Sequence, residues 1–185
     1  SLFNYLVASG GPEQKTIIFC ARDRHADNVA IEMNNLYASW CADNGIQRVE
    51  DYAFKCTAAG GKDYLSELKG STRHHFIATT VDLLTTGVDV PPVVNIVFFK
   101  YVRSPIAFYQ MVGRGTRLNA PTNKLMFKVY DYTNATRLFG EDFKTKFTEQ
   151  EGKPSDVTWV DGGEQQRAIE VLGFDVRVTT AGIYI

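Results

Sequence analysis

The sequence predicts an α/β domain whose β-sheet is mostly parallel and covered by helices on both faces. Short apolar segments rich in β-branched residues alternate with longer segments in which apolar residues recur at helical spacing. This alternation is typical of β-α-β units, because parallel strands must be joined by crossovers. The chain has 185 residues, of which 44% are hydrophobic and 22% charged, so its composition fits one folded domain with a short extension and excludes global disorder.

The first half of the chain is expected to contribute two strands and a long helix. Asp23 is the expected N-cap of that amphipathic helix, which ends near Asn44-Gly45. The other expected elements, in chain order, are a lead-in segment or short helix at 1–14, buried strands at 15–21 and 51–57, and a brief helix at 63–68.

The second half continues the same alternation and then changes character. Ser104 and Pro105 suit the N-cap and the first position of a helix that reaches about Arg117. The other elements expected up to residue 140 are strands at 75–80, 94–100 and 125–132 and a short helix at 82–86. Later segments predict a linker, a short helix and a strand or hairpin, at 152–155, 164–172 and 174–185. We therefore expect three parts, namely a lead-in at 1–14, the α/β domain at 15–140, and a linker with a C-terminal extension at 141–185.

Charge and cysteine usage narrow the class of protein. The formal net charge is −1, which argues against binding nucleic acid by bulk charge alone but is compatible with a local basic groove. Three well-separated cysteines, Cys20, Cys41 and Cys56, have no metal-ligand spacing and predict a reduced, cytoplasmic protein. No apolar run is long enough to cross a membrane, and the first residue is not methionine, so we expect a fragment of a longer protein with no membrane partner.

The most specific functional signal lies at the end of the helix that Ser104 is expected to begin. Residues 110–117 carry the pattern Gln-x-x-Gly-Arg-x-x-Arg. Arg114 and Arg117 are three residues apart and share one helix face. Such a pair can hold a γ-phosphate and the charge that builds up during its transfer, while Gly113 lets the backbone approach closely. The alternative is two solvated arginines on a surface helix.

A second signal follows the strand expected at 75–80. This strand runs into a threonine-rich turn and then a Gly-x-Asp step, formed by Gly87 and Asp89. Ligands bind at the carboxyl ends of strands in open α/β sheets, where hydroxyls and free helix amides suit phosphates, and Asp89 suits ribose hydroxyls. The alternative is that these residues are only caps and turns. The threonines concerned are Thr79, Thr80, Thr85 and Thr86.

A third signal closes the strand expected at 15–21. Arg22 and Arg24 come directly after this strand, at the start of the long helix. Basic residues in this position can contact the backbone of a nucleic acid, and such contacts position a protein without reading the sequence. The alternative is again a pair of solvated surface arginines.

Taken in this order, the three segments resemble the C-terminal motor domain of superfamily 2 helicases, with motif IV near 15–26, motif V at 78–91 and motif VI at 109–117. The two later segments look most similar to the motor (R) subunit of type I restriction enzymes, which couples ATP hydrolysis to translocation along double-stranded DNA and then to cleavage. The resemblance implies the second RecA-like domain of such a motor, a three-layer sandwich with a mostly parallel sheet.

The resemblance also implies roles for individual residues. Arg114 and Arg117 match the arginines that reach ATP across a cleft between two lobes, and Gln110 matches the glutamine that links the γ-phosphate to closure of the lobes. Two sets of binding residues are implied as well. The ATP-binding set comprises Gly87, Asp89 and Gly113. The DNA-binding set comprises Arg22, Thr79, Thr80, Thr85 and Thr86.

Two features that ATP hydrolysis requires are not found in the sequence. It has no Gly-x-x-x-x-Gly-Lys-Ser/Thr phosphate loop and no strand that ends in an Asp-Glu pair suited to Mg²⁺. We therefore expect ATP and Mg²⁺ to be bound mainly by a first RecA-like domain, and the isolated chain to be inactive. The implied partners are double-stranded DNA, the N-terminal RecA-like domain of the same subunit, and the methylation and specificity subunits of the restriction complex.

Two other functions are compatible with the same residues. Another superfamily 2 helicase, acting on DNA or RNA, would share these motifs, and a non-catalytic α/β module that binds a phosphorylated ligand or a protein would share the fold. The binding module differs from the motor in one testable respect. It does not need Arg114 and Arg117 beside an open, domain-sized face.

Overall fold

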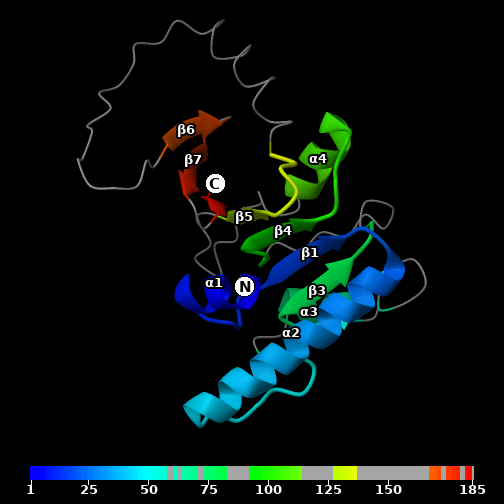
Figure 1. Ribbon diagram of the computed structural model, residues 1–185, viewed down its shortest axis with the longest axis vertical. Coiled ribbons are helices and arrows are strands. Elements are labelled where there is room, and N and C mark those ends of the chain that lie inside the picture. The colour runs from blue at the N-terminus through cyan, green and yellow to red at the C-terminus, as the bar shows by residue number, and fades with distance from the viewer. Residues whose placement is uncertain are drawn as a thin grey trace, which may run out of the picture.

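One β-sheet runs through the chain and carries helices on both of its faces (Figure 1). The computed structural model describes residues 1–57, 61, 64–70, 73–82, 92–113 and 127–136, together with the backbone of 167–171, 174–179 and 182–184. Within these residues the strand order is β2-β3-β1-β4-β5-β8-β7-β6. The strands are β1 (Thr16–Cys20), β2 (Ala53–Lys55), β3 (Ile77–Thr80), β4 (Asn95–Phe99), β5 (Lys128–Asp131), β6 (Arg167–Val171), β7 (Phe174–Thr179) and β8 (Gly182–Tyr184).

The strands β1 to β5 form the parallel part of this sheet, with β1 between β3 and β4. Every residue of β1 is buried, which explains why its sequence is continuously apolar rather than alternating. Cys20 lies opposite Phe99, and Phe98 lies opposite Asp131, so the carboxyl ends of β1, β4 and β5 reach similar levels. The predicted parallel α/β architecture is confirmed.

The C-terminal strands continue the same sheet in the antiparallel sense. β8 pairs with β5, and β7 pairs with both β8 and β6. The hairpin predicted within 174–185 is confirmed, but the short helix predicted at 164–172 is wrong, because residues 167–171 form β6. This segment contains the β-branched residues Ile169 and Val171, and pairing with β7 along the whole strand overrides its helical propensity.

Four described helices cover the two faces of the sheet. α1 (Leu2–Ala8) and α2 (Asp23–Asn44) pack on one face, and α3 (Leu65–Gly70) and α4 (Pro105–Val112) pack on the other. Side chains of β1 alternate between the two cores, Ile18 facing α1 and α2 and Phe19 facing α3 and α4. Figure 1 shows α2 and α4 on opposite sides of the sheet. No helix in the described ranges combines the length and apolarity that crossing a bilayer requires.

The ends of α2 show one difference from the sequence prediction. Arg22, in extended conformation, is the N-cap, and Asp23 is the first helical residue instead of the cap. A carboxylate in the first turn still interacts favourably with the helix dipole. At the other end Gly45 has φ +64°, the left-handed conformation that glycine adopts most easily, and the predicted stop at Asn44-Gly45 is confirmed.

α4 begins as the sequence predicted. The Ser104 hydroxyl accepts a hydrogen bond from the amide of Ala107 at 3.4 Å, and Pro105 occupies the first helical position. The helix ends at Val112, whereas the prediction extended it to about 117. Residues 114–117 and the helix predicted at 82–86, apart from Asp82 itself, lie outside the described residues.

Candidate functional site

The carboxyl ends of the parallel strands lie at one edge of the sheet, where the first motif ends, the second leaves β3, and the connection to the helix that carries Gln110 begins. β1 ends before Arg22, β3 ends before Val81, and β4 leads through residues 100–104 into α4. The register pairs Phe19 with Thr80, so β1 and β3 end at similar levels. Open α/β sheets bind their ligands at this edge. The candidate functional site is therefore the carboxyl edge formed by β3, β1, β4 and β5.

Gln110 lies in the last turn of α4 and is exposed. Its neighbours Phe108, Met111 and Val112 are buried against the sheet, so the opposite face of α4 carries Gln110. The amide of Gly113 donates to the carbonyl oxygen of Tyr109 at 2.8 Å. The backbone around this glycine is closely packed, because a Cβ added to Gly113 would lie 3.0 Å from that same oxygen. Arg114 and Arg117 lie outside the described residues.

Thr79 and Thr80 lie inside the domain and have no exposed surface. The Thr79 hydroxyl donates to the carbonyl oxygen of Ala26 in α2 at 2.8 Å. The Thr80 hydroxyl is buried and has no hydrogen-bond partner within the described part of the chain. Neither hydroxyl reaches the surface in this arrangement, as the DNA contact predicted for them requires. The hydrogen bond of Thr79 instead connects β3 to the first turn of α2.

Arg22 is exposed between β1 and α2, as a contact with a ligand requires. The two nearby carboxylates are engaged elsewhere, because the Lys55 ammonium lies 2.9 Å from an oxygen of both Asp23 and Asp27. Hydrogen bonding to Lys55 lowers the pKa of Asp23, and hydrogen bonding to the two carboxylates raises the pKa of Lys55. Lys55 thus neutralises part of the negative charge at the start of α2. The other predicted contacts, Thr85, Thr86, Gly87 and Asp89, lie outside the described residues.

The loop after β5 is organised by Asp131. Its carboxylate accepts hydrogen bonds from the backbone amides of Thr133 at 2.9 Å and Thr136 at 2.8 Å, and from the Thr136 hydroxyl at 2.8 Å. Burial raises the pKa of Asp131, but these hydrogen bonds together lower it by a larger amount. The pKa of Asp131 is therefore below its ordinary value. This loop was not among the predicted sites, although Asp-x-Thr at the end of a strand is a typical pattern for side chains that bond to nearby backbone.

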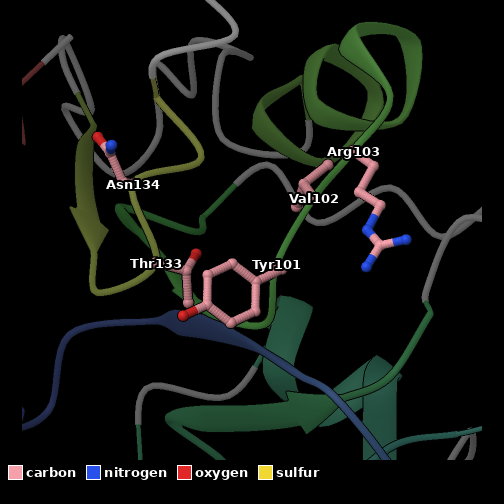
Figure 2. A pocket seen from close by; sticks show the side chains of 5 residues that line it. All are labelled: Tyr101, Val102, Arg103, Thr133 and Asn134. Atoms are coloured by element: carbon pink, nitrogen blue, oxygen red, sulfur yellow. The ribbon is translucent and has the colours of Figure 1, made fainter.

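A pocket of about 290 Å³ lies between the ends of β4 and β5. Tyr101, Val102, Arg103, Thr133 and Asn134 line it (Figure 2). Figure 2 shows the Tyr101 ring turned toward Thr133 and the Arg103 side chain turned away from it. Tyr101 is 79% exposed. An exposed aromatic ring can stack on a base, and an exposed guanidinium can bind a phosphate; neither residue was among the predicted site residues.

The parallel sheet, its two helical layers and the order of the motif segments along the chain define a RecA-like domain of the kind found in helicase-type motors. The chain belongs to the helicase conserved C-terminal domain family, whose family model matches residues 1–119.

Curated relatives of the chain are restriction enzymes. The chain is 41% identical over 135 residues to the type I restriction enzyme EcoKI endonuclease subunit of Escherichia coli strain K12. It is 32% identical over 134 residues to the type I restriction enzyme EcoAI endonuclease subunit of Escherichia coli. These alignments cover 70% and 71% of this chain but only 11% and 16% of the two relatives, so the chain spans a small part of their length.

Solved structures agree with this family. A fragment of an HsdR subunit of a type I restriction enzyme from Vibrio vulnificus YJ016 has a TM-score of 0.64 and 36% identity, and the match covers 75% of this chain and 27% of that one. The C-terminal part of the Fun30 ATPase domain has a TM-score of 0.52 at 10% identity, with coverage of 75% and 42%. At that identity the second match shows the fold alone.

Proposed function

We propose that this chain is the second motor domain of an ATP-dependent double-stranded DNA translocase, of the kind found in the R subunit of type I restriction enzymes. The observation that carries the proposal is the position of Gln110, which is exposed in the last turn of α4, the helix that follows the carboxyl end of β4. The motif that begins at Gln110 continues directly into Arg114 and Arg117. Similarity to two type I endonuclease subunits supports the same assignment.

In this proposal ATP binds between this domain and a preceding RecA-like lobe, which supplies the phosphate loop and the ligands of Mg²⁺. Mg²⁺ would neutralise charge on the phosphates. Arg114 and Arg117 reach across the cleft and stabilise the negative charge that develops on the γ-phosphoryl group. Gln110 contacts the same γ-phosphate and links it to closure of the cleft, and Gly113 allows the backbone to approach the nucleotide closely. Closure of the cleft couples ATP hydrolysis to movement along DNA.

The remaining residues of the proposal serve nucleotide and DNA binding. Gly87 and Asp89 approach the ribose, and Arg22, Thr85 and Thr86 contact the DNA backbone. Arg22 is the described member of this group, and its exposure at the end of β1 supports the role. Because Thr79 and Thr80 are buried, we propose that they hold the end of β3 rather than touch DNA. In the assembled enzyme, the methylation and specificity subunits would be further partners.

The test is the DNA-stimulated ATPase activity of this domain expressed together with the RecA-like lobe that precedes it. We expect Arg114→Ala and Arg117→Ala each to lower kcat by about 10³-fold or more, because a trans-acting arginine typically contributes 10³ to 10⁵. Arg48→Ala is a matched control, since Arg48 is exposed between α2 and β2, away from the carboxyl edge. Full activity in both motif variants would contradict the proposal, and stimulation by RNA alone would favour an RNA helicase.

A further inference from the structure

Lys100 extends across the carboxyl edge of the sheet and links two strands that are not neighbours. It is the first residue after β4, and its ammonium donates to the carbonyl oxygen of Val81, directly after β3, at 2.8 Å. In the sheet order, β1 lies between β3 and β4. Adjacent strands are about 4.8 Å apart, so the lysine spans about 10 Å. Its side chain therefore passes over the end of β1.

The surroundings of Cys20, the last residue of β1, agree with this position. Burial raises the pKa of the Cys20 thiol to about 12, and the positive charge of Lys100 acts in the opposite direction. The Lys100 ammonium is therefore close enough to the end of β1 to act on its last side chain. Arg22 follows Cys20 by two residues, so Lys100 lies near the first and second motif segments.

The backbone of Lys100 is held from the side of β5. The Thr133 hydroxyl donates to the carbonyl oxygen of Lys100 at 2.9 Å. The Thr133 amide in turn donates to the Asp131 carboxylate at 2.9 Å. A continuous series of hydrogen bonds thus runs from Asp131 through Thr133 and Lys100 to Val81, and it ties together the ends of β5, β4 and β3.

These contacts place Lys100 between the segment that follows β3 and the segment that leads into α4. Val81 begins the segment that contains Thr85 and Thr86, which we propose to contact DNA. On its other side, residues 101–104 connect Lys100 to α4, whose last turn carries Gln110. A displacement of Val81 relative to Lys100 must stretch or reorient this charged hydrogen bond. Such bonds are shorter and stronger than neutral ones.

We propose that Lys100 is a positioning residue that couples the DNA-contacting segment after β3 to the nucleotide-contacting end of α4. This inference rests on the proposed function. Lys100 contacts neither ATP nor DNA in this scheme, and it acts by holding the Val81 carbonyl at a fixed distance from the start of the 101–104 connection. Its removal should uncouple DNA binding from ATP hydrolysis while both ligands still bind.

The test compares Lys100→Met with Lys100→Arg in the domain expressed with its preceding lobe. Methionine keeps an unbranched stem without the donor, whereas arginine keeps the charge and donors. For Lys100→Met we expect a tenfold or greater loss in the stimulation of kcat by double-stranded DNA. Basal kcat, the KM for ATP and the Kd for DNA should each stay within about twofold, and Lys100→Arg should recover most of the stimulation.

A second measurement does not depend on motor activity. In the 185-residue chain alone, Lys100→Met should raise amide hydrogen exchange of peptides that cover residues 79–82, while the 53–57 region stays unchanged. Thr133→Val, which removes the bond to the Lys100 backbone without changing the ammonium, should reduce DNA stimulation in the same direction but by less.

The outcomes separate the two proposals. If the wild-type protein shows no ATPase stimulation by DNA, the proposed function fails, while the hydrogen-exchange result still reports on the Lys100 contact. If the wild type is stimulated and Lys100→Met is stimulated equally, only the coupling role is overturned. An equal loss of basal and stimulated activity, or a loss of folding in Lys100→Met with normal coupling in Thr133→Val, would also overturn it, because the contact would then be structural.

Discussion

The buried threonine pair at the end of β3 provides a direct test of the difference between structural and ligand-binding roles. Thr79 and Thr80 are adjacent and equally buried, yet within the residues that the structure describes only the Thr79 hydroxyl has a hydrogen-bond partner, the carbonyl oxygen of Ala26 at 2.8 Å. Replacing each threonine by valine removes one hydroxyl and keeps the β-branched shape. Thr79→Val should therefore lower the stability of the domain, whereas Thr80→Val should not.

The expected magnitudes follow from these contacts. Thr79→Val loses one buried hydrogen bond, which is worth about 1 kcal/mol, and the Ala26 carbonyl keeps its acceptor role within α2. Thr80→Val removes a buried hydroxyl that pays a desolvation cost without a bond, so we expect it to be neutral or to stabilise by up to about 1 kcal/mol. For a domain of this size, 1 kcal/mol corresponds to a shift in Tm of roughly 2–4 °C.

Urea denaturation and thermal melting of the 185-residue chain measure these differences. DNA affinity of the protein expressed with its preceding lobe gives the functional readout, and we expect Thr79→Val to leave the Kd unchanged where the protein is folded. The reasoning is refuted if Thr80→Val destabilises the domain as much as Thr79→Val. A large loss of DNA affinity in folded Thr79→Val would restore a direct role in binding.

Two further predictions concern charged groups. Asp131→Asn should destabilise the chain by about 2 kcal/mol at neutral pH, because the carboxylate accepts several hydrogen bonds in the loop after β5. The pKa of Asp131 is below its ordinary value of 3.8, so the carboxylate's contribution to the free energy of unfolding is fully present above pH 3.8 and is lost as the pH falls through the lowered pKa. An acid unfolding profile of Asp131→Asn that matches the wild type would contradict this. Burial lowers the pKa of Lys15 from 10.5 to about 8, with Glu67 acting in the opposite direction, so between these values the unfolded chain binds more protons than the folded one. The free energy of unfolding should rise between pH 8 and 10.5 relative to Lys15→Met, and parallel pH profiles for the two proteins would show that Lys15 is not desolvated.

Much of the fold could be predicted from local signals. The continuous apolar run of β1, the Ser104-Pro105 start of α4 and the stop at Gly45 each depend on only a few neighbouring residues, and all three are confirmed. The strand β6 could not be predicted in this way. Its conformation depends on pairing with β7, and nearby residues alone do not specify that partner.

The candidate site was predictable in its location but not in its internal contacts. Motif order and the rule that parallel strands end at one edge were enough to place Arg22 and the segment that leads into α4, the helix that carries Gln110, at the same edge of the sheet. The inward direction of Thr79 depends on which face of β3 receives α2. The reach of Lys100 to Val81 depends on β1 lying between their strands. Both facts are properties of the tertiary arrangement, so no local pattern encodes them.

The pairing of β8 with β5 has a practical consequence for how this protein can be divided. A polypeptide ended at residue 140 would keep all five parallel strands but would leave the β5 backbone unpaired on one side. An open strand edge of this kind is a template for association with other chains. The residues needed to protect the sheet thus include β8, which begins 51 positions beyond the end of β5 (182 − 131).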